Sequence, residues 1–252
     1  MPKHDLAFDP PVMNAAGCLG FFPNLHGPID WGRFGAFVTN PVSLTPRTPA
    51  HGSRFEAFPG GFLLHTGYPN PGMAQVLRRH AGHWSRSPLP VIVHLLARDA
   101  VEVSKMARRL ETVEGVSGLE VGVVSDVSAE MVAALTQAAS GELPVIMHLP
   151  MERSVALACV AIQAGAVAVS LAPPRGIFPA QDGELMQGRL YGPAILPLAL
   201  RMVHELTQLG IPTIGAGGVY TQEHKKAMLA AGAMAVQLDS LLWRGAGYLS
   251  LM

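Results

Sequence analysis

Short apolar runs, separated by longer stretches with helical periodicity, dominate this chain. Each run has the length of one β-strand, and most of the runs end in a polar residue or a glycine. Parallel strands that are buried on both faces have near-continuous apolar sequences of this kind. The eight runs are residues 12–17, 36–40, 90–95, 118–125, 144–149, 166–172, 212–218 and 235–240.

Helical segments lie between these runs. Residues 100–110 carry apolar side chains three and four positions apart, and residues 154–164 repeat this spacing. Gly165 and Gly232 follow predicted helices, where glycine commonly ends a helix. Strands that alternate with helices in this way predict a (β/α)8 TIM barrel, formed as a single domain by residues 1–252. The chemistry of such a barrel lies at the C-terminal ends of its strands.

Three segments depart from the plain repeat. Residues 41–88 and 173–193, after the second and sixth predicted strands, are rich in proline and glycine and predict long irregular loops over the barrel mouth. Only twelve residues follow the last predicted strand, so the final helix is expected to be truncated. This tail is mostly apolar, and we expect it to pack on the barrel or on a second subunit, which favours a homo-oligomer.

Composition narrows the class of protein. Hydrophobic residues make up 49% of the chain and charged residues 14%, which is typical of a folded protein with a large core. The formal net charge of zero gives no reason to expect nucleic acid or an anionic membrane as a partner. The two cysteines lack metal-ligand spacing and fit a reducing, cytoplasmic setting. No run of 18 apolar residues predicts a membrane span.

Glycines and small polar residues end the last two predicted strands. Gly217 and Gly218 follow the seventh strand, and Asp239 and Ser240 follow the eighth. The loops at these places in a barrel commonly bind phosphate, because glycines let backbone N–H groups approach an anion. Alternatively, the glycines only permit a tight turn. A carboxylate on Asp239 would disfavour a phosphate beside it unless the side chain points away.

Three polar residues lie inside neighbouring apolar runs. His94, Glu120 and His148 are placed by strand alternation on one face, for which the barrel interior is the natural choice. One such histidine would more often belong to the core, but three together indicate a site. They are also possible metal ligands, with His65 as a third imidazole. Ser125 ends the fourth run and is either a site residue or a helix cap, a role that Ser128 could equally fill.

The chain resembles the dihydroorotate dehydrogenase-type flavoproteins, which are FMN-dependent barrels. Residues 11–17, 34–47, 59–72, 192–203 and 211–219 carry the resemblance. The resemblance implies that FMN lies on the backbone at the ends of the first, seventh and eighth strands. The cofactor-binding residues that it implies are Ala15, Ala16, Gly17, Thr39, Asn40, His148, Gly192, Gly217, Gly218, Asp239 and Ser240. Asn70 matches a substrate-binding asparagine of the family, and His65 lies near it in the same segment.

Several positions depart from the family pattern. Asn40 and His148 stand where the family has lysines near the flavin. Arg54, Arg175 and Arg189 lie in the insertions, where they either are solvated at the surface or hold an anionic substrate. Most of the substrate-binding asparagines are replaced, by Leu64, Gly122, Val127 and Pro173. A site that has lost its hydrogen-bond partners rejects the substrate that needed them. The substrate is therefore expected to differ from dihydroorotate.

We accordingly expect an FMN-dependent oxidoreductase that transfers hydride between a small, non-dihydroorotate substrate and the flavin. The candidate catalytic residues are Ser125, which falls at the family's base position, His148, His94 and Glu120, and the candidate substrate contacts are His65 and Asn70. No metal, nucleic acid or membrane is expected. Two alternatives stay open: a catalytically lapsed relative that serves as a binding or assembly module, and a flavin-free lyase or hydrolase that uses His94, Glu120 and His148.

Overall fold

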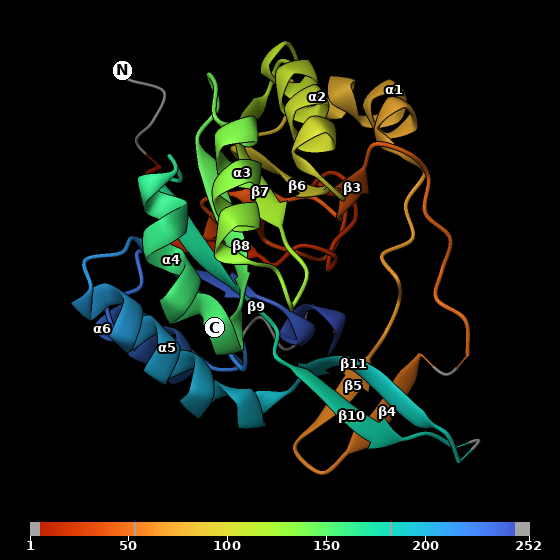
Figure 1. Ribbon diagram of the computed structural model, residues 1–252, viewed down its shortest axis with the longest axis vertical. Helices are drawn as coiled ribbons and strands as arrows, with labels where there is room; N and C mark the ends of the chain where they lie inside the picture. The colour runs from red at the N-terminus through yellow and green to blue at the C-terminus, as the bar shows by residue number, and fades with distance from the viewer. Residues whose placement is uncertain (1–5, 53, 182, 245–252) are drawn as a thin grey trace.

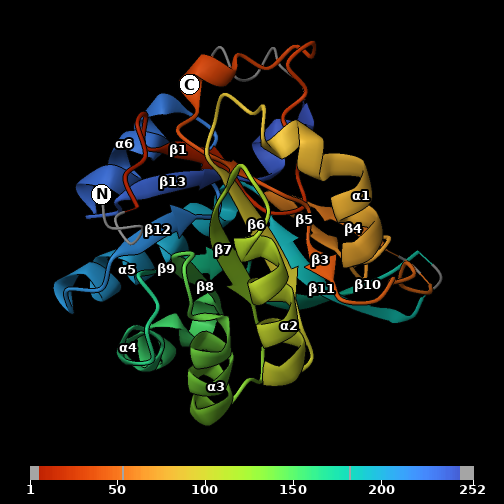
Figure 2. The same cartoon turned by 90° about the horizontal axis from the view of Figure 1, so that it is seen from above.

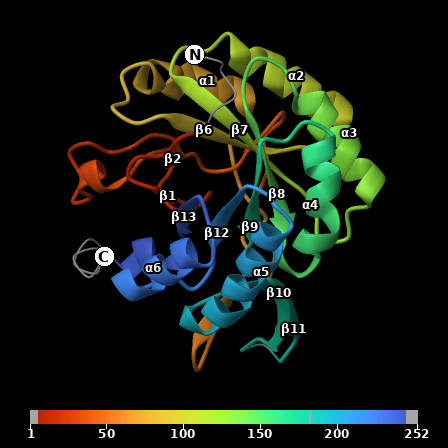
Figure 3. The same ribbon diagram turned by 90° about the vertical axis from the view of Figure 1, so that its left-hand side faces the viewer.

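Eight parallel strands form a nearly closed barrel with helices around its outside (Figure 1, Figure 3). The computed structural model describes residues 6–52, 54–181 and 183–244. The strand order is β1-β13-β12-β9-β8-β7-β6-β2. The barrel closes between β1 and β2, where the N–H of Gly35 donates to the carbonyl of Val12 at 2.8 Å and Met13 pairs with Ala36. The predicted TIM barrel is confirmed.

Each barrel strand overlaps one of the eight predicted runs. The strands are β1 (Val12–Asn14), β2 (Phe37–Val38), β6 (Val91–Leu96), β7 (Val116–Gly122), β8 (Val145–Pro150), β9 (Ala168–Ala172), β12 (Thr213–Ala216) and β13 (Ala235–Leu238). The short strand β3 (Val42–Ser43) also pairs with β6.

The outer layer consists of helices whose ends follow sequence signals. The helices are α1 (Met73–Trp84), α2 (Ala100–Glu111), α3 (Ala129–Ala139), α4 (Ser154–Gln163), α5 (Leu196–Gln208) and α6 (Gln222–Ala230), and α2 and α3 pack side by side (Figure 2). Gly165 and Gly232 follow α4 and α6 with φ of +112° and +105°, so both act as predicted at a helix end. Ser128 caps α3, since its hydroxyl accepts the N–H of Met131 at 3.2 Å.

The two insertions pair with each other, although the sequence analysis predicted irregular loops. They form an antiparallel sheet of order β10-β11-β5-β4, which projects from the barrel (Figure 1). Its strands are β4 (Phe55–Phe58), β5 (Gly61–Leu64), β10 (Arg175–Pro179) and β11 (Leu185–Tyr191). The prediction of irregular structure was wrong because the pairing is non-local, for example Phe62 with Tyr191, and local composition carries no signal for such a contact.

The barrel interior has an apolar layer below a polar one. The apolar layer consists of Met13, Ala36, Val38, Ile92, Ile146, Ala168, Ile214 and Ala235. Two positions further along each strand the side chains point to the same face. On β6, β8, β9 and β13 these next positions hold the buried polar residues His94, His148, Ser170 and Gln237. On β7 the buried Glu120 pairs with His94 and belongs to the same layer. The polar layer therefore lies nearer the C-terminal ends of the strands, where barrel enzymes carry their chemistry.

The final strand leads into a short 3-10 helix, η4 (Ser240–Arg244). The rest of the apolar tail, including the predicted truncated helix, lies outside the described residues. Within the described part of the chain, Cys18 and Cys159 are both free thiols, and none of the helices has the length and apolar character needed to cross a membrane.

Candidate active site

Glu120 is the centre of a hydrogen-bonded cluster inside the barrel. Its side chain is completely buried on β7. One carboxylate oxygen lies 2.6 Å from Nδ1 of His94, and the other accepts from the Ser170 hydroxyl and from Nε2 of Gln237, each at 2.7 Å. Nδ1 of His148 lies 2.9 Å from the Ser170 hydroxyl oxygen. Side chains from β6, β8, β9 and β13 are therefore positioned through one carboxylate on β7.

This pattern determines how the two histidines are protonated. The single proton of the Ser170 hydroxyl is donated to Glu120, so Nδ1 of His148 must be the donor in its contact with Ser170. Nδ1 of His94 likewise donates to the carboxylate, because an ionised carboxylate only accepts hydrogen bonds. Both rings thus direct Nε2 away from Glu120, and both histidines line the cavity at the barrel mouth.

Burial and hydrogen bonding place one negative charge in this cluster. Burial alone would raise the pKa of Glu120, but the interactions with His148, His94 and Ser170 outweigh it and hold that pKa at about 2. Burial lowers the pKa of His148 to about 4, and the charge of Glu120 offsets this only in part. At neutral pH, Glu120 is therefore ionised and His148 is neutral. His148 can hydrogen-bond a ligand but cannot replace a lysine as a cation.

The low pKa of His148 predicts acid sensitivity of the fold. The unfolded chain binds a proton at His148 below about pH 6.5, whereas the folded protein does so only near pH 4. Stability therefore falls as the pH drops through this window, by about 3 kcal/mol at most for this group. We expect urea unfolding to show that the free energy of unfolding falls less between pH 7 and pH 4 in His148→Gln than in the wild type. His204 is exposed on α5 and provides the control, since His204→Gln should follow the wild type. Equal losses in all three proteins would contradict the assignment.

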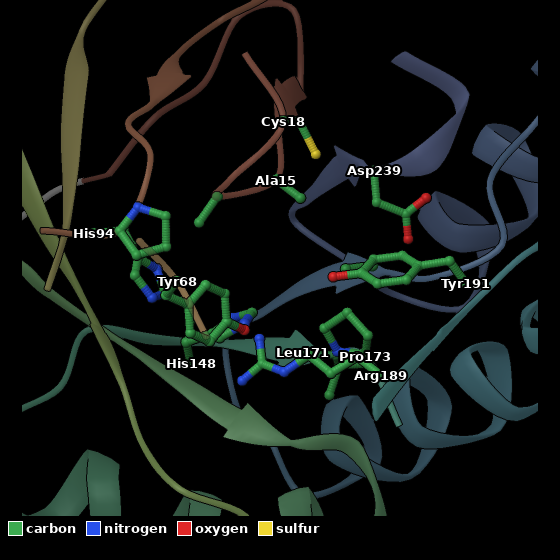
Figure 4. Close-up of a pocket in the computed structure, with 13 residues that line it drawn as sticks. Ala15, Cys18, Tyr68, His94, His148, Leu171, Pro173, Arg189, Tyr191 and Asp239 are labelled. Atoms are coloured by element: carbon green, nitrogen blue, oxygen red, sulfur yellow. The ribbon is translucent and has the colours of Figure 1, made fainter. Parts of the chain in front are cut away.

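The cavity beside the two histidines, called the inner cavity here, is small and mixed in character. It measures about 20 Å³. Figure 4 shows His94 and His148 at one end and Asp239 and Tyr191 at the other. The lining residues are Ala15, Ala16, Cys18, Pro41, Tyr68, His94, His148, Leu171, Pro173, Arg189, Tyr191, Ala216 and Asp239. They come from the barrel strand ends and from the sheet of the insertions, so the β10–β11 hairpin completes the wall.

Arg189 and Tyr68 give the inner cavity a cation and an unpaired hydroxyl. The Arg189 guanidinium carbon lies 4.5 Å from the centroid of the Tyr68 ring, and an arginine keeps its charge even where burial lowers its pKa. The Tyr68 hydroxyl is buried and has no hydrogen-bond partner among the described residues. Tyr68 also has a φ of +54°, a conformation that costs energy in a non-glycine residue. Both features are typical of a position that contacts a ligand.

Asp239 closes the opposite end of the inner cavity. Its carboxyl is 3% exposed, and Oδ1 accepts the backbone N–H of Ser240 at 2.5 Å and the Ser240 hydroxyl at 2.9 Å. Burial raises the pKa of Asp239, and the hydrogen bonds from Ser240 offset part of that rise. The N–H of Ser240, a predicted phosphate donor, is therefore already bound by the side chain before it. The Asp239 carboxylate thus lies on the N–H group that the sequence analysis predicted to bind the phosphate.

The glycine turn between β12 and α6 has a clear packing role. Gly217 and Gly218 have φ of +105° and +73°, and a Cβ on Gly218 would lie 2.4 Å from the backbone nitrogen of Leu196. Only glycine lets this turn pack on the start of α5. Thr221 caps the following helix by accepting the N–H of His224 at 3.3 Å. These contacts support the tight-turn interpretation, and phosphate binding at the turn stays a prediction.

Comparison with known proteins identifies the family. A family model described as dihydroorotate dehydrogenase matches residues 3–122. The chain is 31% identical over 251 residues to the catalytic subunit of dihydroorotate dehydrogenase B (NAD(+)) from Pelobacter propionicus, covering 91% of this chain and 83% of that protein. The chain belongs to the dihydroorotate dehydrogenase family. Dihydroorotate dehydrogenase A (fumarate) from Lacticaseibacillus paracasei is 30% identical over 257 residues, covering 91% of this chain and 87% of that protein. The resemblance predicted from the sequence is thereby confirmed.

Some residues that the sequence analysis singled out lie at the inner cavity, and others do not. Ala15, Ala16, His94, His148 and Asp239 line it. Gly17 follows Ala16 directly, with a φ of +87°. Ser240 and Gly192 instead line a second, larger cavity next to it. Thr39 lies behind His94, since its hydroxyl oxygen accepts the His94 backbone N–H at 3.1 Å.

Four other predicted site residues have structural contacts elsewhere. Ser125 lies in the turn after β7 and does not line the inner cavity. The side chain of Asn40 accepts the N–H of Gly20 at 3.0 Å and braces the loop after β1. Asn70 holds its own turn by accepting the N–H of Gly72 at 3.0 Å. His65 does not line the inner cavity either, and its backbone N–H donates to the Arg54 carbonyl at 2.9 Å.

The sequence analysis missed Ser170 and Gln237 as site residues. Both are polar residues inside apolar strand runs, as His94 and His148 are, and they share the same alternation along their strands. A polar residue inside an apolar strand run is a usable signal, because its buried side chain needs a hydrogen-bond partner in the barrel. Ser170 and Gln237 both carry this signal. Tyr68 and Tyr191 carried no comparable signal, since only the pairing of the two insertions brings them to the mouth.

Proposed function

We propose that this protein is an FMN-dependent oxidoreductase that acts on a small molecule at the barrel mouth. The observation that carries the proposal is the cluster in which Glu120 orients His94 and His148 toward the inner cavity, in a chain of the dihydroorotate dehydrogenase family. A buried carboxylate that orients a histidine is a common arrangement for moving protons in enzymes. The FMN, when bound, would accept or supply the hydride.

The donor set of the inner cavity fits the chemistry of a flavin. Ala15 and Ala16 line the cavity with small side chains, the Tyr68 hydroxyl supplies a free hydrogen-bonding group, and Arg189 supplies a positive charge. Arg189 thus supplies the cation that neutral His148 cannot provide. Ligand sites typically measure about 300–1,000 Å³, whereas the inner cavity measures about 20 Å³. We therefore propose that the side chains of Tyr191 and Asp239 turn aside when the cofactor enters.

His94 is the proposed proton-transfer residue. Its Nδ1–H is fixed on Glu120, so its Nε2 lies toward the substrate and can take up or return a proton there. The carboxylate of Glu120 stabilises the imidazolium that forms during such a transfer. His148 holds its neutral tautomer through Ser170 and orients the substrate by accepting a hydrogen bond.

Replacing His94 by glutamine is expected to slow the reaction about 10²- to 10⁴-fold, which is the usual contribution of a positioned acid or base. The measurement is the rate of flavin reduction by substrate in FMN-loaded protein without oxygen. His204→Gln, an exposed change on α5, should leave that rate unchanged. A His94→Gln protein that reduces its flavin at the wild-type rate would contradict the assigned role.

The substrate that we propose is a small molecule other than dihydroorotate. Gly122 stands where the sequence analysis placed a substrate-binding asparagine of the family, and a Cβ at Gly122 would lie 2.6 Å from Nε2 of His94. A longer side chain there would collide with His94, so this chain has a histidine in the space of that amide. A pocket altered in this way favours a different hydrogen-bonding pattern on the substrate.

Dihydroorotate oxidation is the second candidate, favoured by the names of the relatives at about 30% identity. The two candidates are separated by adding dihydroorotate to the FMN-loaded protein without oxygen and following the flavin absorbance. We expect no bleaching by dihydroorotate and bleaching by another reduced small molecule. Rapid bleaching by dihydroorotate would establish the second candidate instead. Among the described residues, no group of three or more His, Cys, Asp or Glu side chains is arranged to hold a metal ion.

A further inference from the structure

Gln237 reaches the Glu120 cluster from the far side of the barrel. Gln237 lies on β13 and Glu120 on β7, and these strands stand on opposite sides of the barrel. The strands β12, β9 and β8 separate them one way round, and β1, β2 and β6 separate them the other way. The Gln237 side chain is 1% exposed, and its Nε2 donates to Oε1 of Glu120 at 2.7 Å. Gln237 therefore holds the carboxylate from the opposite wall.

This hydrogen bond fixes which way the Gln237 amide points. An ionised carboxylate only accepts hydrogen bonds, so the NH2 group must face Glu120 and the carbonyl oxygen, Oε1, must face away. Oε1 of Gln237 is buried and has no hydrogen-bond partner among the described residues. A buried acceptor without a partner lowers stability, and a methionine of similar length would avoid that loss. A polar side chain kept in this place indicates a role in the site.

The bond from Gln237 determines which histidine contacts the carboxylate. Oε1 of Glu120 accepts from both the Gln237 amide and the Ser170 hydroxyl, so both of its acceptor positions are filled. Nδ1 of His148 lies 3.7 Å from this oxygen and bonds the Ser170 hydroxyl oxygen instead, at 2.9 Å. The other carboxylate oxygen, Oε2, receives Nδ1 of His94 at 2.6 Å. The carboxylate thus contacts His94 directly and His148 only through Ser170.

We propose that Gln237 is a positioning residue that assigns the Glu120 carboxylate to His94 and so keeps the roles of His94 and His148 distinct. Without the Gln237 amide, one acceptor position on Oε1 is open. The Nδ1–H of His148 can then close the 3.7 Å separation and bond the carboxylate directly. The roles of the two histidines rest on the proposed function, whereas the competition for Oε1 of Glu120 exists in the protein without cofactor.

Replacement of Gln237 by methionine tests the proposal, because methionine fills a similar space without an amide. NMR of isotope-labelled histidine follows the titration of His148 in the cofactor-free protein. We expect His148 to bind its proton about tenfold more tightly in Gln237→Met than in the wild type, the effect of one charge-assisted hydrogen bond. In the FMN-loaded protein, flavin reduction by substrate should slow about tenfold, because the carboxylate that stabilises the imidazolium of His94 is then shared.

Thr136→Val is the matched control for loss of a buried hydrogen bond. The buried Thr136 hydroxyl donates to the Val132 carbonyl at 2.7 Å within α3, outside the Glu120 cluster. This change should lower stability but leave the His148 titration and the rate of flavin reduction unchanged. A Gln237→Met protein whose His148 titrates as in the wild type would overturn the proposal. Equal shifts in Gln237→Met and Thr136→Val would also overturn it, because general loosening of the fold would explain both.

The side-chain amide of Gln237 gives a second test in the wild-type protein, which applies even if Gln237→Met does not fold. Its amide protons should exchange slowly with solvent and should shift as the pH falls through the His148 pKa of about 4. Those of Gln208, which is exposed at the end of α5, should do neither. Gln237 protons that behave like those of Gln208 would overturn the proposal. A protein that gives the expected NMR results but never binds FMN would refute only the proposed function.

Discussion

Substitution of Glu120 by alanine is expected to lower the free energy of unfolding by about 3–5 kcal/mol, the cost of removing one partner from a buried charged cluster. The change removes the acceptor of hydrogen bonds from His94, Ser170 and Gln237, each within 2.7 Å of the carboxylate. These donors stay inside the barrel, where each unsatisfied group costs about 1–3 kcal/mol. Urea unfolding at pH 7 measures the loss.

The Glu120 prediction has two matched controls. Glu120→Gln keeps the shape of the side chain but removes the charge. Its free energy of unfolding should therefore lie between those of the wild type and Glu120→Ala. Glu205→Ala, on the outside of α5, removes an exposed carboxylate paired with Arg201 and should cost less than about 1 kcal/mol. A loss below about 1 kcal/mol for Glu120→Ala would show that the cluster does not organise the barrel mouth.

Replacement of Asp239 by asparagine is expected to strengthen FMN binding about 10- to 100-fold. The carboxylate lies at the end of β13 on the N–H of Ser240, where the sequence predicts the FMN phosphate. Two unit charges about 5 Å apart repel by about 3 kcal/mol at an effective dielectric constant near 20, and 1.4 kcal/mol is a factor of ten. Asparagine keeps the hydrogen-bond acceptor and removes the charge. Titration calorimetry with FMN measures the change.

Riboflavin provides the control for the Asp239 prediction, since it carries the same ring system without the phosphate. Its affinity should differ little between the wild type and Asp239→Asn. FMN binding to the wild type should also strengthen as the pH falls, because protonation of Asp239 removes the same repulsion. Equal FMN affinities in the two proteins would place the phosphate away from Asp239. An equal gain for FMN and riboflavin would point to altered packing instead of charge.

Strand alternation predicted much of the site. It placed His94, Glu120 and His148 on one interior face, and the structure joins them in a single cluster. The same rule applies to Ser170 and Gln237, which the sequence analysis did not single out although both are buried polar residues of the same kind. Alternation is local, so it can be read from a single strand. The hydrogen bonds that connect five strands through Glu120 cannot be read from a single strand, because they form only when the strands come together in the barrel.

The parts that sequence reasoning did not predict depend on non-local pairing and on where strands end. The strand β7 ends at Gly122, so Ser125 falls in the following turn and away from the inner cavity. Tyr191 reaches the mouth only because β11 pairs with β5 across more than a hundred residues of chain. The position of the Asp239 side chain was an open question in the sequence, since a carboxyl at a strand end can turn either way.

Binding of FMN to the purified protein tests the central claim most directly. The protein is mixed with FMN, separated from free flavin by gel filtration, and its visible absorption spectrum is recorded for the wild type and Asp239→Asn. We predict that a flavin absorption band stays with both proteins, approaching one flavin per chain and retained more fully by Asp239→Asn. If both proteins emerge colourless, and calorimetry shows no saturable binding of FMN to either, the assignment as an FMN-dependent oxidoreductase is contradicted.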